Sequence, residues 1–231
     1  MHENIYIISD VHGCYKSLLA LIDKLPNKEK SKICFVGDLV DRGNNSCDVV
    51  KLIMDNNYDC VLGNHEQVFI EHFHMLENDR ENPSLSRWLF KTGGEQTVNS
   101  YTSKDEFYKQ IEFLKKLPLY REYKNYKTND ERYLVVSHSC VGRKWHLRRR
   151  ENKKEKDLFK IQLLWSRYKN FDNKKIFNVY GHTIFEEPII NEYSCGIDLG
   201  CYKRKPRIKN PRLCALEFPS MRIITQENIE L

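Results

Sequence analysis

The sequence has no run of about 18 consecutive apolar residues, which is the length that a membrane-spanning helix needs. Its beginning, MHENIYIISD, also lacks the basic, apolar and small-residue order of a secretion signal. The eight cysteines are irregularly spaced and never form C-x-x-C, so we expect reduced, mostly buried thiols. These absences predict a cytoplasmic protein that does not enter a membrane.

Internal repeats and low-complexity linkers are absent as well. The chain has 231 residues, of which 40% are hydrophobic. A chain of this length and composition buries one sizeable core, which excludes a disordered or fibrous protein. We therefore predict a single domain over residues 1–231, and we expect it to act as a monomer.

The net charge of +6 is unevenly distributed. Residues 143–160 hold nine Lys or Arg against three acidic residues, and residues 203–212 hold six against none. These two basic segments could attract an anionic partner at the rim of a site, although two solvated loops are the simpler interpretation. Aromatic residues are sparse in both segments, so nucleic acid is a poor candidate for that partner.

In the first half of the chain, short apolar runs alternate with helical spacings, which is typical of strands joined by crossover helices. We expect strands at residues 5–9, 33–37 and 60–62, and helices at 15–25, 48–54 and 66–76. Helical spacings over residues 83–117 indicate a helical insertion that ends at Pro118. Later strands are expected at 133–137, 176–180, 197–199, 213–218 and 222–225. The pattern predicts an α/β fold, parallel first and mostly antiparallel later.

Polar side chains follow five of these apolar runs directly. The segments IYIISDVHG, ICFVGDLVDRG, CVLGNHE, LVVSHS and NVYGHT supply Asp10, His12, Asp38, Asp41, Arg42, Asn64, His65, His138 and His182. In parallel α/β sheets the ligand site lies beyond the carboxyl ends of the strands. We therefore expect these side chains to converge on one crevice.

Six of these side chains have the chemistry of metal ligands. Asp, Asn and His without a thiolate suit a hard or borderline divalent ion such as Mn, Fe, Co, Ni or Zn. Six ligands are too many for one catalytic ion that keeps positions open for water. Two ions that share one carboxylate would accommodate them.

The same segments resemble a known family. DVHG at 10–13, GDLVDRG at 37–43, GNHE at 63–66, SH at 137–138 and GH at 181–182 are similar to the signature blocks of metallophosphoesterases of the phosphoprotein-phosphatase type. The chain most resembles the bacterial and bacteriophage lambda-type serine/threonine protein phosphatases. WLFKTGG at 88–94, LLWSR at 163–167 and GIDLGC at 196–201 extend the likeness over nearly the whole chain.

The resemblance implies a calcineurin-like α/β fold, in which two mixed β-sheets are sandwiched between helices and a dimetal site lies at the carboxyl ends of the strands. It also implies roles for individual residues. Asp10 and His12 would hold one metal, Asp38 would bridge, and Asn64, His138 and His182 would hold the other. His65, oriented by Asp41, would protonate the leaving oxygen, and Arg42 and Arg167 would bind phosphate oxygens. Two divalent ions, Mn²⁺ foremost, would supply a hydroxide that attacks phosphorus directly.

The main prediction is therefore a serine/threonine protein phosphatase that acts on phosphorylated proteins or peptides. The alternative is a hydrolase of nucleotides, either of diadenosine tetraphosphate or of cyclic nucleotides. Leu62 favours that alternative, because many protein phosphatases of this type carry Arg before GNHE, whereas the tetraphosphate hydrolases tend to carry Leu. The intact DRG containing Asp41 favours a protein phosphatase, because the nucleotide enzymes usually lack this acid. A nucleic-acid-binding module with incidental chemistry is the third and weakest interpretation.

Overall fold

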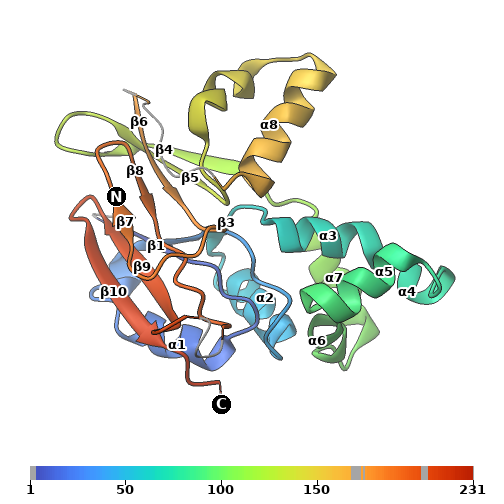
Figure 1. Cartoon of the computed structure of the whole chain (residues 1–231). Helices are drawn as coiled ribbons and strands as arrows, with labels where there is room; N and C mark the ends of the chain where they lie inside the picture. The colour runs from blue at the N-terminus through green and yellow to red at the C-terminus, as the bar shows by residue number, and fades with distance from the viewer. Residues whose placement is uncertain (1–3, 168–172, 174, 204–207, 231) are drawn as a thin grey trace.

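The computed structural model describes residues 4–167, 173, 175–203 and 208–230. Its centre is a pair of five-stranded sheets, with helices outside them (Figure 1). The first sheet has the order β10-β9-β1-β2-β3. Its strands are β1 (Ile5–Ile8), β2 (Lys32–Phe35), β3 (Asp59–Cys60), β9 (Arg212–Phe218) and β10 (Arg222–Glu227).

The second sheet has the order β4-β5-β6-β8-β7. Its strands are β4 (Tyr120–Lys127), β5 (Tyr133–Ser137), β6 (Ile176–Tyr180), β7 (Ile189–Ile190) and β8 (Ser194–Gly196). Both sheets are mixed, because β1-β2-β3 and β5-β6-β8 run parallel whereas β9, β10, β4 and β7 pair antiparallel with their neighbours. The predicted fold class of two mixed sheets is therefore confirmed.

Alternating side chains place the main core between the two sheets. In β1, Ile5 and Ile7 point into the core that the sheets share, whereas Tyr6 and Ile8 face the helices on the other side. In β5, Leu134 and Val136 enter the shared core while Val135 faces outward. Since both faces of these strands are covered, continuous apolar runs are stable there, and the polar residues that follow them mark the strand ends.

Helices cover the outer faces and extend to one side of the sheets (Figure 1). The helices of the first half are α1 (Tyr15–Asp23), α2 (Ser46–Asp55), α3 (Asn64–His72), α4 (Met75–Asn78), α5 (Pro83–Arg87), α6 (Gly94–Asn99) and α7 (Lys104–Leu114), with short turns at Lys28–Lys30 and Trp88–Thr92. The helical insertion expected over residues 83–117 is thus present. Within the described ranges, no helix is both long and apolar enough to cross a membrane.

Two sequence expectations about the second half were wrong, and one strand was not expected. The strand expected at residues 197–199 lies at Ser194–Gly196 and ends two residues before the polar Asp198. The strand β4 was not expected, because its exposed polar residues hide the strand pattern. The second half is also less antiparallel than expected, since β5, β6 and β8 form a parallel set.

The basic segment 143–160 is helical instead of being a solvated loop. It forms most of a 3₁₀ helix (Gly142–Arg149) and the beginning of α8 (Lys153–Trp165), which stands apart from the other helices in Figure 1. Apolar side chains of both pieces, including Trp145 and Phe159, pack on the second sheet. Residues 204–207 of the other basic segment, 203–212, lie outside the described residues.

Candidate active site and metal centre

The predicted site residues lie where the strands end. Asp10 and His12 follow β1, and Asp38 and Asp41 follow β2. Asn64 and His65 begin α3, which is separated from β3 by residues 61–63. In the second sheet, His138 follows β5 and His182 follows β6. All eight side chains are buried. The two sheets therefore deliver their polar strand ends to one place.

Asp38 lies at the centre of two groups of potential metal ligands. Its Oδ2 is 3.5 Å from His12 Nε2 and 4.0 Å from His65 Nε2, while its Oδ1 is 3.4 Å from His138 Nε2. The first group comprises His12, Asp38 and His65, and the second comprises Asp38, His138 and His182. Burial alone would raise the pKa of Asp38, but the imidazoles of His138, His65 and His12 outweigh it and lower that pKa. One carboxylate thus faces both groups.

Backbone carbonyls orient two of the imidazoles. His12 Nδ1 lies 2.9 Å from the carbonyl of Val40, and His138 Nδ1 lies 2.9 Å from that of Val36. Burial lowers the pKa of both rings, that of His12 to about 3, so each ring is neutral and donates its Nδ1 proton to the carbonyl. The unprotonated Nε2 atoms then point at Asp38. A histidine that ligates a metal with one ring nitrogen typically donates a hydrogen bond from the other.

The donor atoms around His138 fit a cation. His138 Nε2 lies 2.8 Å from Asn64 Oδ1 and 3.1 Å from His182 Nδ1. When His138 carries its proton on Nδ1, the lone pair of its Nε2 faces a lone pair of Asn64 Oδ1. These lone pairs repel each other unless a cation lies between them. His182 Nε2 is buried without a hydrogen-bond partner in the described part of the chain. The donor set of oxygen and nitrogen atoms therefore fits a pair of divalent ions that share Asp38.

Asp10 lies beside these groups but outside the two tight clusters. Its carboxylate accepts hydrogen bonds from the backbone N–H of His182, at 3.0 and 3.2 Å. Gly181 makes this possible, because a Cβ atom at that position would lie 1.8 Å from Asp10 Oδ1. Burial, Asp198 and Asp38 raise the pKa of Asp10 well above its usual value. Its role as a ligand stays a prediction.

His65 and Asp41 form a close pair. His65 Nδ1 lies 2.6 Å from Asp41 Oδ2, which leaves Nε2 facing Asp38. Burial by itself would lower the pKa of His65, but Asp38 and Asp41 raise it. The pair has the geometry of an imidazole that is oriented by a carboxylate and exchanges a proton at its other nitrogen.

Two residues that the sequence did not single out hold Asp41 in place. Trp88 Nε1 donates to both carboxylate oxygens, at 3.3 and 3.1 Å. Thr97 Oγ1 donates to Asp41 Oδ1 at 2.8 Å and accepts from the Asp41 backbone N–H, also at 2.8 Å. Trp88 belongs to the quoted WLFKTGG block, whereas Thr97 carries no signal in the sequence. The helical insertion therefore supports the Asp41–His65 pair.

We expect the substitution Thr97→Val to destabilise the protein by about 1–3 kcal/mol, because it leaves two buried groups of Asp41 without this partner. It should also slow turnover, most for substrates with poor leaving groups. Urea denaturation and steady-state kinetics measure the two effects. Thr92→Val is the matched control, since the one hydrogen bond that the Thr92 hydroxyl makes to a described residue goes to the carbonyl of Trp88. Equal behaviour of the two variants would show that Thr97 does not position Asp41.

Glu66 is a second residue whose role only the structure reveals. Its Oε2 accepts from the backbone N–H groups of Asp38 (2.8 Å) and Gly63 (2.9 Å), and its Oε1 accepts from that of Leu39 (2.7 Å). The pKa of Glu66 is raised to about 7. Burial is the largest cause, and the negative charge of Asp38 is the second. Glu66 thus ties the loop after β2 to the loop after β3. The sequence shows it only as the last letter of GNHE.

Backbone strain is concentrated at the site. His12, Asp38, Asp41, Arg42 and His182 all adopt positive φ, between 47° and 73°. Residues other than Gly adopt this region uncommonly, Asn, Asp and His more often than the rest, and each instance costs on the order of 1–3 kcal/mol. The surrounding hydrogen bonds hold these residues in conformations that bring their side chains together.

The two predicted phosphate-binding arginines come from different parts of the fold, the loop after β2 and the residues after α8. Arg42 follows Asp41, and its buried Nε has no partner among the residues that the structure describes. Arg167 follows α8 and is exposed, yet its charge contributes to lowering the pKa of His138 and His182. Leu62 is buried at the beginning of the GNHE loop and supplies no cation. The site is therefore cationic at Arg42 and Arg167 but apolar at Leu62.

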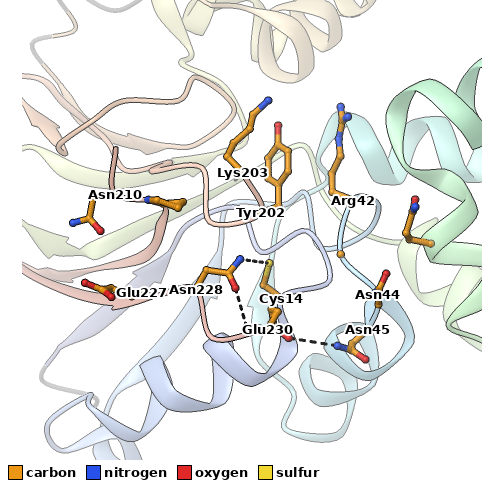
Figure 2. A pocket seen from close by; sticks show the side chains of 13 residues that line it. Cys14, Arg42, Asn44, Asn45, Tyr202, Lys203, Asn210, Glu227, Asn228 and Glu230 are labelled. Carbon is orange, nitrogen blue, oxygen red and sulfur yellow. Dashed lines mark hydrogen bonds between the residues drawn. The ribbon is translucent and has the colours of Figure 1, made fainter. Parts of the chain in front are cut away.

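A polar cavity of about 680 Å³ adjoins Arg42 (Figure 2). Tyr202 also lines it, and the Tyr202 ring lies 4.4 Å from the ring of His12. Asp198, buried near Asp10, was quoted only within GIDLGC, and burial raises its pKa to about 7. Neither Tyr202 nor Asp198 was expected at the site, because both lie in a loop whose path the strand pattern does not predict.

Curated proteins similar to this chain are symmetrical bis(5'-nucleosyl)-tetraphosphatases. The protein of Escherichia coli O17:K52:H18 is 27% identical over 146 residues, which cover 62% of this chain and 45% of the relative. The protein of Salmonella typhimurium is 27% identical over 145 residues, with the same coverage. The match thus spans a little less than half the length of these relatives.

Solved structures agree on the fold. A protein provisionally described as a diadenosine tetraphosphatase superposes with a TM-score of 0.68 at 20% identity, over 97% of this chain and 93% of its own. A serine/threonine phosphatase from Saccharomyces cerevisiae, with similarity to human phosphatase PP5, gives a TM-score of 0.60 at 17% identity, over 100% of this chain and 81% of its own. The sequence model for the calcineurin-like phosphoesterases matches residues 3–211. The chain therefore belongs to the calcineurin-like phosphoesterase family.

Proposed function

We propose that the protein hydrolyses dinucleoside polyphosphates, such as diadenosine tetraphosphate, at a centre of two divalent cations. The observation that carries this proposal is the similarity to symmetrical bis(5'-nucleosyl)-tetraphosphatases over 62% of the chain. The buried Leu62 supports it, since a substrate that extends beyond one phosphate does not require a clamp on a terminal dianion there. The sequence had placed protein substrates first, and the relatives favour its alternative.

The two groups of potential ligands support the metal-binding part of the proposal. His12 and Asp10 would hold one cation, Asn64, His138 and His182 the other, and Asp38 both. Calcineurin-like phosphoesterases use a dinuclear metal centre. When bound, two such ions lower the pKa of water and polarise phosphoryl oxygens, and Mn²⁺ is our first candidate. The Nδ1 hydrogen bonds of His12 and His138 orient these rings for ligation.

The remaining residues act on the substrate. His65 Nε2 would donate a proton to the leaving oxygen, with Asp41 stabilising the imidazolium at Nδ1. Arg42 and Arg167 would neutralise charge on the phosphate oxygens as it shifts during transfer. The buried Nε of Arg42 is a donor that such an oxygen would satisfy.

Protein phosphatase activity is the second candidate, and the Asp41–His65 pair is the observation that favours it. A phosphoserine leaves as an alkoxide, which needs a proton far more than a nucleoside diphosphate does. A carboxylate 2.6 Å from His65 Nδ1 strengthens the proton donor that this leaving group demands. The fold is shared by both classes and does not distinguish them.

Turnover of matched substrates tests the proposal. We expect kcat/KM for diadenosine tetraphosphate in the presence of Mn²⁺ to exceed that for phosphoserine and phosphothreonine peptides by at least about tenfold, and cyclic nucleotides to react more slowly still. Ten-fold corresponds to about 1.4 kcal/mol of transition-state stabilisation. Turnover of an aryl phosphate measures the amount of active enzyme in each preparation. A higher kcat/KM for the phosphopeptides would reassign the protein to the protein phosphatases.

A further inference from the structure

The cavity adjoins the candidate metal centre through two of its lining residues, Arg42 and Tyr202. Arg42 lines the cavity and carries the loop of Asp41, and Tyr202 lines the cavity while its ring contacts that of His12. The volume of about 680 Å³ is within the range of sites for small molecules and cofactors. A substrate bound at the candidate metal centre would meet this cavity at Arg42 and Tyr202.

The wall next to the metals is cationic. The Arg42 guanidinium lies 5.4 Å from the centre of the Tyr202 ring, and the Lys203 ammonium lies 4.9 Å from it. Figure 2 shows Lys203, Tyr202 and Arg42 side by side, with their polar ends pointing the same way. Two cations held by one aromatic ring suit a chain of phosphates better than a single phosphate, because each can pair with a different phosphoryl group.

The other end of the cavity carries one neutral amide, that of Asn210, and one carboxylate, that of Glu227. Figure 2 labels Asn210 and Glu227 on the opposite side of the cavity from Arg42. In the described part of the chain, the side-chain amide of Asn210 makes no hydrogen bond. An amide can pair with the edge of a base, and a carboxylate can accept from ribose hydroxyls.

Hydrogen bonds hold residues 228–230, of which Asn228 and Glu230 line the cavity. Asn228 Nδ2 donates to the carbonyl of Cys201 at 2.7 Å. The backbone N–H of Ile229 donates to Ser17 Oγ at 3.0 Å, and the backbone N–H of Ser17 donates to Glu230 Oε1 at 2.7 Å. These bonds fix residues 228–230 against α1, so the cavity exists before a ligand enters, which lowers the entropic cost of binding.

We propose that this cavity binds one nucleoside diphosphate half of the substrate, with Arg42 and Lys203 on its phosphates and Asn210 and Glu227 around its nucleoside. The inference rests on the proposed function, since it assigns a subsite to the same reaction. It makes Lys203 a substrate-binding residue, in a basic segment for which the sequence indicated either attraction of an anionic partner or a solvated loop.

Binding of ADP to chelator-treated protein tests the subsite without catalysis. We expect Lys203→Met to weaken ADP binding in equilibrium dialysis by about tenfold, the loss typical of one charge-assisted hydrogen bond. Lys209→Met is the matched control, because Lys209 is an exposed lysine of the same basic segment that does not line the cavity as described. Equal weakening by both substitutions, or an ADP affinity of the wild-type protein too low to measure, would overturn the proposal.

A second variant separates the nucleoside from its phosphates. Asn210→Ala should weaken ADP binding several-fold and leave pyrophosphate binding unchanged, whereas Lys203→Met should weaken both. Equal loss of both ligands in Asn210→Ala would overturn the assignment of the far end to the nucleoside. A protein that binds ADP in this pattern but does not hydrolyse diadenosine tetraphosphate when loaded with Mn²⁺ would refute the proposed function and support the subsite.

Discussion

Replacing Asp38 with asparagine is expected to lower turnover of every phosphoester by about 10³-fold or more. Its two oxygens face both groups of potential ligands, at 3.4–4.0 Å from three imidazole nitrogens. Loss of a single electrostatic contact to a transition state typically costs about 10²–10³-fold, and here both cations lose a shared ligand. Asparagine keeps the shape of the side chain and the Oδ1 acceptor for the His65 backbone N–H, which lies at 3.0 Å.

Elemental analysis of the purified variant distinguishes a metal defect from a folding defect. We expect fewer divalent ions per chain in Asp38→Asn than in the wild-type protein, with an unchanged circular dichroism spectrum. Asp55→Asn is the control, because Asp55 is exposed and pairs only with Lys51 in the described structure. Chelation should inactivate the wild-type enzyme reversibly. Wild-type turnover that survives exhaustive chelation would refute the two-cation centre.

Replacing His65 with alanine is expected to slow turnover by about 10²–10⁴-fold for substrates with poor leaving groups, and much less for activated aryl phosphates. The reason is that only a basic leaving oxygen needs the proton that His65 Nε2 would donate. Aryl phosphates of graded leaving-group acidity measure this dependence without requiring the natural substrate. The exposed His74 provides the control His74→Ala, which should behave as the wild-type enzyme does.

The structure gives this experiment a second purpose. His65 Nε2 lies close enough to Asp38 and His12 to belong to one of the two groups of potential ligands. A proton donor that is not a ligand leaves the metal content of His65→Ala at the wild-type value. Loss of a metal, or equal slowing for all leaving groups, would instead make His65 a ligand.

The sequence alone predicted the fold class and the residues that meet at the site. Apolar runs such as Ile5–Ile8 and Tyr133–Ser137 are continuous because helices and a second sheet cover both faces of the strands. The polar residues after those runs therefore had to lie at strand ends, and parallel strands bring their ends together. More than 90 residues separate Asp10, His12 and Asp38 from His138 and His182. Their convergence could still be predicted, because each motif is recognised from its own strand end.

Only the tertiary structure revealed what supports and extends that site. Thr97 holds Asp41 from 56 residues away, and Tyr202 contacts His12 across most of the chain, so no local pattern marks either residue. The basic segment 143–160 became helical because Trp145 and Phe159 bury against the second sheet, an apolar contribution that its charge had concealed. The cavity next to Arg42 is lined in part by Asn228 and Glu230, which lie more than 180 residues further along the sequence. Such long-range contacts depend on how the elements pack, and that packing is decided by the whole chain.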